Sequence, residues 1–361
     1  MSSSARCSNT IAADIPYVHT GPWDTYNVVS QQGEVYPVTI GIGVLCDGGE
    51  TAILASDMRV TYRSSTLPPT DAAGKQYDFA PLLLAAAVAG EPKVCHPVIT
   101  EIAEQLRKLL AAKKEHSEQL LVFEHIRLII EYSRKKELRK LQGCAMEAKL
   151  GVSLAEWQAG KLPNADKLDP LALQWGRTVL EDVRDKLRYS LGLILLGFVD
   201  NGPVFFRAWG AEPLDEAANP EFYAIGSGSE AALDVLIRRE QNIYTTMARS
   251  LLHLYEALKA ARQHEKTVGP PAPYIVIRPH NAAKPTGVMR FPAESKLLRG
   301  WGKAYRKRMS TESLDKDLPN VQVKHLLERH VPMRSQVLTD QTVNLESVAL
   351  ASKAASAFKS N

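Results

Sequence analysis

The chain has 361 residues, of which 45% are hydrophobic and 23% charged, and its formal net charge is +4. This composition is typical of a globular protein with a large core and argues against an intrinsically disordered chain. The small positive charge argues against nucleic-acid binding. The four scattered cysteines form no C-x-x-C pair that would predict a zinc site or a disulfide framework.

The N-terminal part contains no sign of secretion. The first ten residues, MSSSARCSNT, lack the apolar centre of a signal peptide. The longest apolar run, residues 191–199, is too short to span a bilayer. We therefore expect a cytoplasmic protein with reduced thiols and no membrane partner. Residues 1–37 are polar and contain several prolines and glycines, which predicts an irregular leader or propeptide.

From residue 38 the pattern becomes that of β-strands. The segments VTIGIGVL and TAILASDMRV surround the turn sequence CDGGE and predict a hairpin. The segments KQYDFAP and LLLAAAVAG predict a second pair of strands, so residues 38–90 are expected to be mostly β.

Helices are predicted next. In residues 91–120 the apolar residues recur at steps of three or four, which is the period of one helix face. A second helical pattern follows, a linker-like stretch precedes residue 170, and a further helix is expected at about 171–188. The basic side chains between residues 113 and 140, including Arg134, are interpreted as a solvated outer face, with a partner-docking arm as the alternative.

The remaining part of the core repeats this order. SLGLILLGFVDNGPVFFRAWG predicts two strands around a turn, FYAIGSGS a strand and a glycine-rich turn, and residues 230–242 and 246–264 two helices. PYIVIRP is expected to be the last strand. Residues 281–361 are basic and weakly periodic, and we expect an appended tail that is partly helical or disordered.

Strands in hairpins that alternate with helices in pairs predict an α+β fold. We expect a four-layer αββα sandwich of two antiparallel sheets with helices outside.

Five segments then occur in a specific order: a strand that opens with Thr39, ASDMRVT, Gly74 and Lys75, AGEPKVC, and FYAIGSGSEAALDVL after LLGFVDNGPVFFRAWG. This succession resembles the proteasome β-subunit and its bacterial relatives of the HslV and Anbu types, which are N-terminal-nucleophile hydrolases. The resemblance spans about residues 38–280, interrupted by an extra helical insertion at about 115–165.

The resemblance implies the chemistry of a threonine-type peptidase. Thr39 would be the nucleophile once cleavage makes it the first residue, and its free α-amine would be the base. Asp57 would orient Lys75, whose positive charge lowers the proton affinity of the site. The backbone N–H of Gly90 would bind the oxyanion.

Further residues are expected to support this site. Ser227, in the glycine-rich turn, would face the threonine. A second family motif, which resembles D-x-x-S-G, matches HEKTVGPP, so Glu265, Thr267 and Gly269 are possible supporting residues. Val268 occupies the position of the family's serine.

Three functions remain open at this point. The first is peptide-bond hydrolysis by Thr39. The second is a catalytically inactive proteasome-like subunit that acts as a scaffold or binding protein, which Val268 and the bulky Val38 before the nucleophile favour. The third is hydrolysis of a small-molecule amide on the same fold.

The expected partners follow from the resemblance alone. They are a peptide or protein substrate, other copies of the chain in a homo-oligomeric ring or partial ring, and an unfoldase or other protein that the sequence does not identify. The chemistry needs no metal and no organic cofactor.

Overall fold

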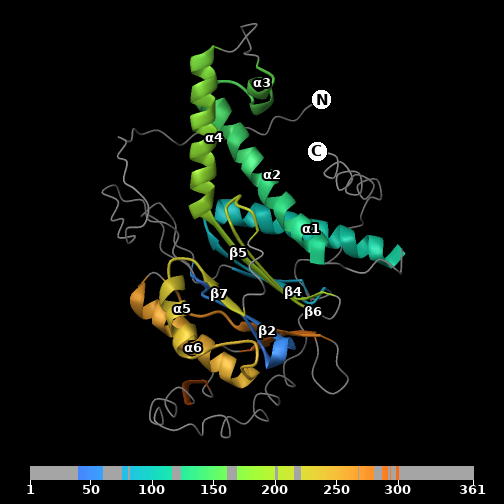
Figure 1. The fold of residues 1–361 in the computed structure, drawn as a ribbon, viewed down its shortest axis with the longest axis vertical. Helices are drawn as coiled ribbons and strands as arrows, with labels where there is room; N and C mark the ends of the chain where they lie inside the picture. The colour runs from blue at the N-terminus through green and yellow to red at the C-terminus, as the bar shows by residue number, and fades with distance from the viewer. Residues whose placement is uncertain are drawn as a thin grey trace.

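The computed structural model describes residues 40–59, 75–79, 82–115, 123–160, 169–199, 202–214, 221–266, 268–279, 287–291, 293 and 298–300. Two antiparallel sheets lie face to face, and helices cover both outer faces (Figure 1). This is the four-layer αββα sandwich that the order of strands and helices predicted.

The first sheet has five strands in the order β7-β1-β2-β8-β9. They are β1 (Gly41–Cys46), β2 (Thr51–Ser56), β7 (Phe222–Ile225), β8 (Tyr274–Arg278) and β9 (Gly287–Phe291). The predicted hairpin of β1 and β2 is confirmed: the two strands pair around a short 3₁₀ turn, η1 (Asp47–Gly49).

Strand β9 corrects one boundary. It pairs with β8 over all five of its residues, so the sheet continues beyond residue 280, where the core domain was expected to end. The physical reason is that β8 has a second edge, whose backbone N–H and C=O groups β9 satisfies.

The second sheet has four strands in the order β3-β4-β5-β6. They are β3 (Gln76–Phe79), β4 (Leu84–Gly90), β5 (Leu191–Val199) and β6 (Gly202–Trp209). Neighbours in this sheet are also neighbours in sequence order, which is the arrangement expected of two hairpins.

Side chains between the two sheets form a core of their own. Strand β4 contributes Ala85, Ala87 and Ala89, and β5 contributes the larger Ile194 and Leu196. The alternate residues of the same strands point to the helices instead. Since both faces of these strands are buried, they read as continuous apolar runs in the sequence.

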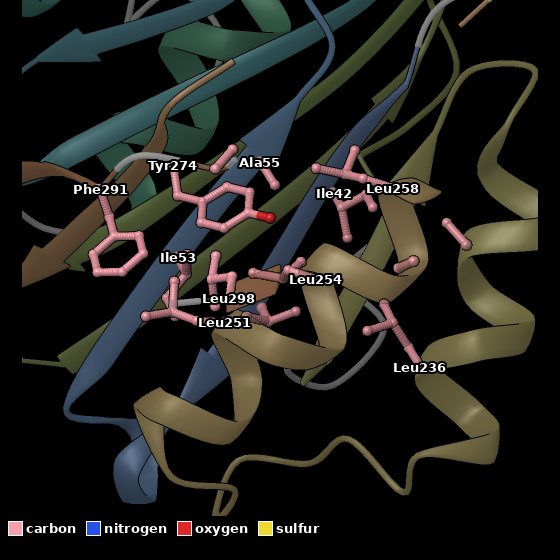
Figure 2. Close-up of a cluster of buried hydrophobic side chains, with 14 of the residues drawn as sticks. Ile42, Ile53, Ala55, Leu236, Leu251, Leu254, Leu258, Tyr274, Phe291 and Leu298 are labelled. Carbon is pink, nitrogen blue, oxygen red and sulfur yellow. The ribbon is translucent and has the colours of Figure 1, made fainter. Parts of the chain in front are cut away.

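Helices α5 (Ser229–Arg238) and α6 (Met247–His264) cover the first sheet. Their apolar faces pack on the outward residues of β1, β2 and β8, among them Ile42, Ile53 and Tyr274 (Figure 2). The helix face repeats at Leu251, Leu254 and Leu258, as the period of an amphipathic helix requires.

In the described residues four helices lie between β4 and β5 in the sequence, and all but the shortest of them pack on the second sheet. They are α1 (Pro92–Glu115), α2 (Phe123–Leu150), α3 (Leu154–Gln158) and α4 (Pro170–Ser190). Helices α2 and α4 extend beyond the sheets together with α3 (Figure 1). This projection has a small core of its own around Met146, Val152 and Val179. None of the helices in the described ranges is long and apolar enough to cross a bilayer.

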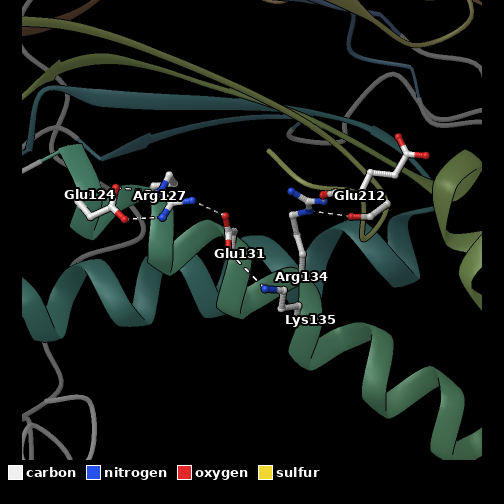
Figure 3. Close-up of polar contacts among 7 residues, drawn as sticks. Glu124, Arg127, Glu131, Arg134, Lys135 and Glu212 are labelled. Carbon is white, nitrogen blue, oxygen red and sulfur yellow. Dashed lines mark hydrogen bonds and ion pairs between the residues drawn. The ribbon is translucent and has the colours of Figure 1, made fainter. Parts of the chain in front are cut away.

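One basic residue of α2 is not part of a solvated face, contrary to expectation. Arg134 is 1% exposed, and its guanidinium donates to the carbonyls of Trp209, the last residue of β6, and of Gly210 and Glu212 beyond it. Figure 3 shows the bond to Glu212. The physical reason is that these carbonyls lie at the end of a strand and just after it, where they need donors from outside the sheet. Burial lowers the pKa of Arg134 to about 10, so the side chain keeps its charge near neutral pH.

Candidate active site around Asp57 and Lys75

A buried ion pair lies at one end of the sandwich. Asp57 directly follows β2, and Lys75 directly precedes β3 of the opposite sheet. The Lys75 Nζ atom lies 2.8 Å from Oδ1 of Asp57. Asp57 is 1% exposed and Lys75 8% exposed. The two sheets therefore bring together two of the residues predicted for the site.

Backbone donors occupy the rest of the Asp57 carboxylate. Oδ1 also accepts the Ile40 N–H at 3.0 Å, and Oδ2 accepts the N–H groups of Arg59 at 3.2 Å and Gly269 at 2.9 Å. A carboxylate has about four lone-pair positions. With these four donors from the described residues, Asp57 is held in one orientation and is suited to positioning Lys75.

The environment changes the acidity of Lys75. Burial lowers the pKa of its ammonium below the ordinary lysine value, and the Asp57 carboxylate opposes that shift. The Lys75 carbonyl accepts the N–H of Val88 at 3.0 Å, which fixes the backbone before β3 to β4. Lys75 is therefore a cation held by both its main chain and its side chain.

Gly90 ends β4, two residues beyond Val88. Its φ is +134°, and a Cβ atom there would lie 2.1 Å from the Ser190 carbonyl oxygen. Only glycine fits such a position. The structure thus places Gly90 on the strand that binds the Lys75 backbone, in front of helix α1.

Ser227 lies in the turn between β7 and α5 and is exposed. Gly226 before it has a φ of +95°. Gly228 after it is the residue that precedes α5, and a Cβ atom there would lie 3.2 Å from Val268 and 3.5 Å from Ile40. The two glycines therefore serve different purposes. Gly226 adopts the positive φ that the turn needs, and Gly228 lets the backbone of the turn lie close to Ile40 at the start of β1.

The segment after α6 reaches the site with its backbone. Gly269 binds Asp57, and a Cβ atom on Gly269 would lie 2.2 Å from Cβ of Arg59. Val268 is buried in the apolar cluster under α5 and α6. Glu265 is the residue directly after α6 and is half-buried, and its carbonyl accepts the N–H of Val268 at 3.1 Å.

Two predicted residues, Thr39 and Thr267, lie outside the described residues. The described chain begins at Ile40, the residue after Thr39, and its N–H is one of the Asp57 donors. Across the described ranges no group of three or more His, Cys, Asp or Glu side chains is arranged to hold a metal ion.

No protein-family model and no curated protein sequence matches this chain. In structure it is similar to a mutant of Anbu from Hyphomicrobium sp. strain MC1, with 11% sequence identity and a TM-score of 0.48 over 77% of this chain and 97% of the other. It is also similar to Anbu, described as an ancestral beta-subunit, from Yersinia bercovieri, with 13% identity and a TM-score of 0.47 over 78% and 98% of the two chains. A further structure of Anbu from Hyphomicrobium sp. strain MC1 has 13% identity and a TM-score of 0.43 over 77% and 97%. These are likenesses of fold.

The sequence did not predict the backbone N–H groups that bind Asp57, nor the Cys95 thiol near Lys75. The N–H groups of Ile40 and Arg59 carry no sequence signal, because every residue except proline has one. The Cys95 thiol on α1 lies close enough to Lys75 to interact with its charge. Burial raises the pKa of Cys95 to about 12, so the thiol stays protonated near neutral pH.

Proposed function

We propose that this chain is a proteasome-like threonine-type peptidase. Cleavage before Thr39 would free its α-amine, which would take the proton of the threonine hydroxyl as that hydroxyl attacks a peptide carbonyl. The observation that carries the proposal is the Asp57 carboxylate, whose Oδ1 accepts both the Lys75 ammonium and the N–H of Ile40, the residue bonded to Thr39.

Each neighbouring group would have a separate role. Lys75, with a pKa that burial lowers, would supply positive charge near the nucleophile and favour the free form of the amine. Asp57 would hold Lys75 in place. The Gly90 N–H would bind the oxyanion, and Ser227 would support the amine. Glu265 and Thr267 would have at most supporting roles, and Gly269 would act through its N–H on Asp57.

A second candidate is a non-catalytic subunit that keeps the sandwich for assembly or binding. One observation favours it: Val268, where the resemblance expects a serine, is buried among apolar side chains and cannot hydrogen-bond to an amine. For either candidate we propose a homo-oligomer in the cytoplasm, which size-exclusion chromatography with light scattering tests.

The experiment that separates the two candidates starts with intact-mass analysis and N-terminal sequencing of the purified chain. The peptidase requires a chain that begins at Thr39 and cleaves fluorogenic peptides. Thr39→Ala should then lose all activity, and Lys75→Met should lose at least about a hundredfold in kcat/KM. A folded chain that retains its leader and cleaves no peptide would leave the scaffold candidate as the better one.

The matched control for Lys75 is Lys93→Met. Lys93 also forms an ion pair, with Glu91 at 3.1 Å, but its side chain is 70% exposed. We expect this variant to keep the full peptidase activity, because a solvated ammonium on the second residue of α1 contributes nothing to the proton transfer.

A further inference from the structure

One buried cation takes no part in the roles proposed above for the peptidase site. Arg134 of α2 is 1% exposed, and its guanidinium donates to main-chain carbonyls. Its Nε lies 2.7 Å from the carbonyl oxygen of Gly210, and its Nη2 donates to the carbonyls of Trp209 and Glu212. A guanidinium presents its donors in a rigid fork, so Arg134 fixes the turn that follows β6.

This turn packs tightly on the last turn of α4. A Cβ atom on Gly210 would lie 2.6 Å from Cα of Arg188, and the Gly210 φ of +46° also favours glycine there. The Gly210 N–H donates at 2.7 Å to the carbonyl of Leu191, the residue directly after α4. The position of the C-terminus of α4 therefore depends on the turn that Arg134 holds.

The same end of α4 contacts the proposed oxyanion turn. The carbonyl oxygen of Ser190, the last residue of α4, accepts the Glu91 N–H at 2.9 Å. That oxygen also fills the space beside Gly90, where a Cβ atom would lie 2.1 Å from it. Since Val88 donates its N–H to Lys75, strand alternation directs the Gly90 N–H to that same side, away from β5. The Ser190 carbonyl thus sets the conformation in which Gly90 presents its N–H.

We propose that Arg134 is a positioning residue for peptide hydrolysis, which fixes the Gly90–Glu91 turn through Gly210 and the last turn of α4. The inference rests on the proposed function, because that function assigns the oxyanion to the Gly90 N–H. A donor stabilises the charge that develops in the transition state only while its direction is fixed in advance. Helix α2 extends from Arg134 into the projection of the α2, α3 and α4 helices (Figure 1), so this projection and the oxyanion turn share one set of hydrogen bonds.

The test compares Arg134→Lys with Met146→Ala in the full chain, at a temperature where circular dichroism shows both to be folded. Met146 is fully buried in the small core of the projection, on the same helix about three turns beyond Arg134, so its truncation destabilises α2 at a distance from the turn after β6. On a fluorogenic peptide, Arg134→Lys should lower kcat at least about tenfold and leave KM within about twofold, because the oxyanion forms only in the transition state. Met146→Ala should keep both constants within about twofold of the wild type.

A second measurement does not depend on catalysis. Amide hydrogen exchange, followed by mass spectrometry on peptides that contain Glu91, reports the hydrogen bond of its N–H to Ser190. Relative to the amides of β2 in the same protein, exchange at Glu91 should become at least about fivefold faster in Arg134→Lys and stay unchanged in Met146→Ala. Gly210→Ala, whose Cβ atom would push the turn away from α4, should act as Arg134→Lys does and replaces it if that variant does not fold.

The outcomes separate this proposal from the peptidase itself. Equal exchange at Glu91 in Arg134→Lys and Met146→Ala would overturn the role of Arg134, whether or not the wild type is active. So would an Arg134→Lys variant whose kcat stays within about twofold of that of an active wild type. A wild type that cleaves no peptide counts against the peptidase, and faster exchange at Glu91 in Arg134→Lys would then still support the positioning of the turn by Arg134.

Discussion

Replacing Lys75 with methionine removes a buried cation while keeping a side chain of similar length. The Asp57 carboxylate would then keep its three backbone donors but lose the ammonium 2.8 Å away. Removing one partner of a buried ion pair costs about 3–5 kcal/mol. Because the Lys75 side chain is 9% exposed and the backbone donors remain, we expect a loss at the lower end, about 3 kcal/mol.

The same reasoning applies to the partner. Asp57→Asn leaves the Lys75 ammonium buried without an anion, and we again expect a loss of about 3 kcal/mol. The double variant removes both charges, so no isolated charge remains. Its loss should also be about 3 kcal/mol rather than the sum of the two, which is a coupling of about 3 kcal/mol.

Urea denaturation of the four proteins measures these free energies of unfolding, with Lys93→Met as the exposed control. That control should lose less than about 1 kcal/mol, because pairs with a solvated partner contribute little. Single losses below about 1 kcal/mol, or additive losses in the double variant, would refute the argument that the pair is buried and mutually dependent.

Three further predictions concern stability. Burial lowers the pKa of His253 to about 3, so below an unfolded pKa near 6.5 only the unfolded state takes up the proton. Between pH 6.5 and 5 the free energy of unfolding of the wild type should therefore fall by about 2 kcal/mol more than that of His253→Gln. Urea denaturation at both pH values measures this difference, and equal losses in the two proteins would contradict the assignment. Gly269→Ala places a Cβ atom 2.2 Å from that of Arg59 and should cost about 2–4 kcal/mol, whereas Gly143→Ala in α2 meets nothing within 4 Å and should be neutral or stabilising in the same assay. Arg134→Met should lower the free energy of unfolding by about 3 kcal/mol, because buried carbonyls lose their donors. Arg134→Lys should not restore this stability, because an ammonium lacks the fork of donors that a guanidinium has. A thermal melt in which either variant behaves like exposed Lys135→Met would show that the buried hydrogen bonds of Arg134 contribute nothing.

Local patterns in the sequence were enough to predict the strands and helices and their arrangement in layers. Alternating or continuous apolar runs marked β1, β2, β4 and β5, and the 3.6-residue period marked α1 and α6. These patterns arise because one or both faces of a segment are buried. The apolar residues that form such a face all belong to the segment itself, so the pattern is visible in the local sequence. The short motifs also predicted Asp57 and Lys75 as site residues, and their side chains lie 2.8 Å apart.

Only the tertiary structure decided how these parts complete one another. Asp57 and its donor Gly269 are 212 positions apart, and the donor is a backbone N–H that no sequence pattern distinguishes. Arg134 belongs to a basic helix, yet the carbonyls that it binds lie at the end of β6 and just after it, 75 or more positions later. Strand β9 joined the sheet because β8 offered an edge. Periodicity shows which face of a segment is apolar. Contacts between distant segments decide which element packs on that face and which charged side chains become buried by that packing.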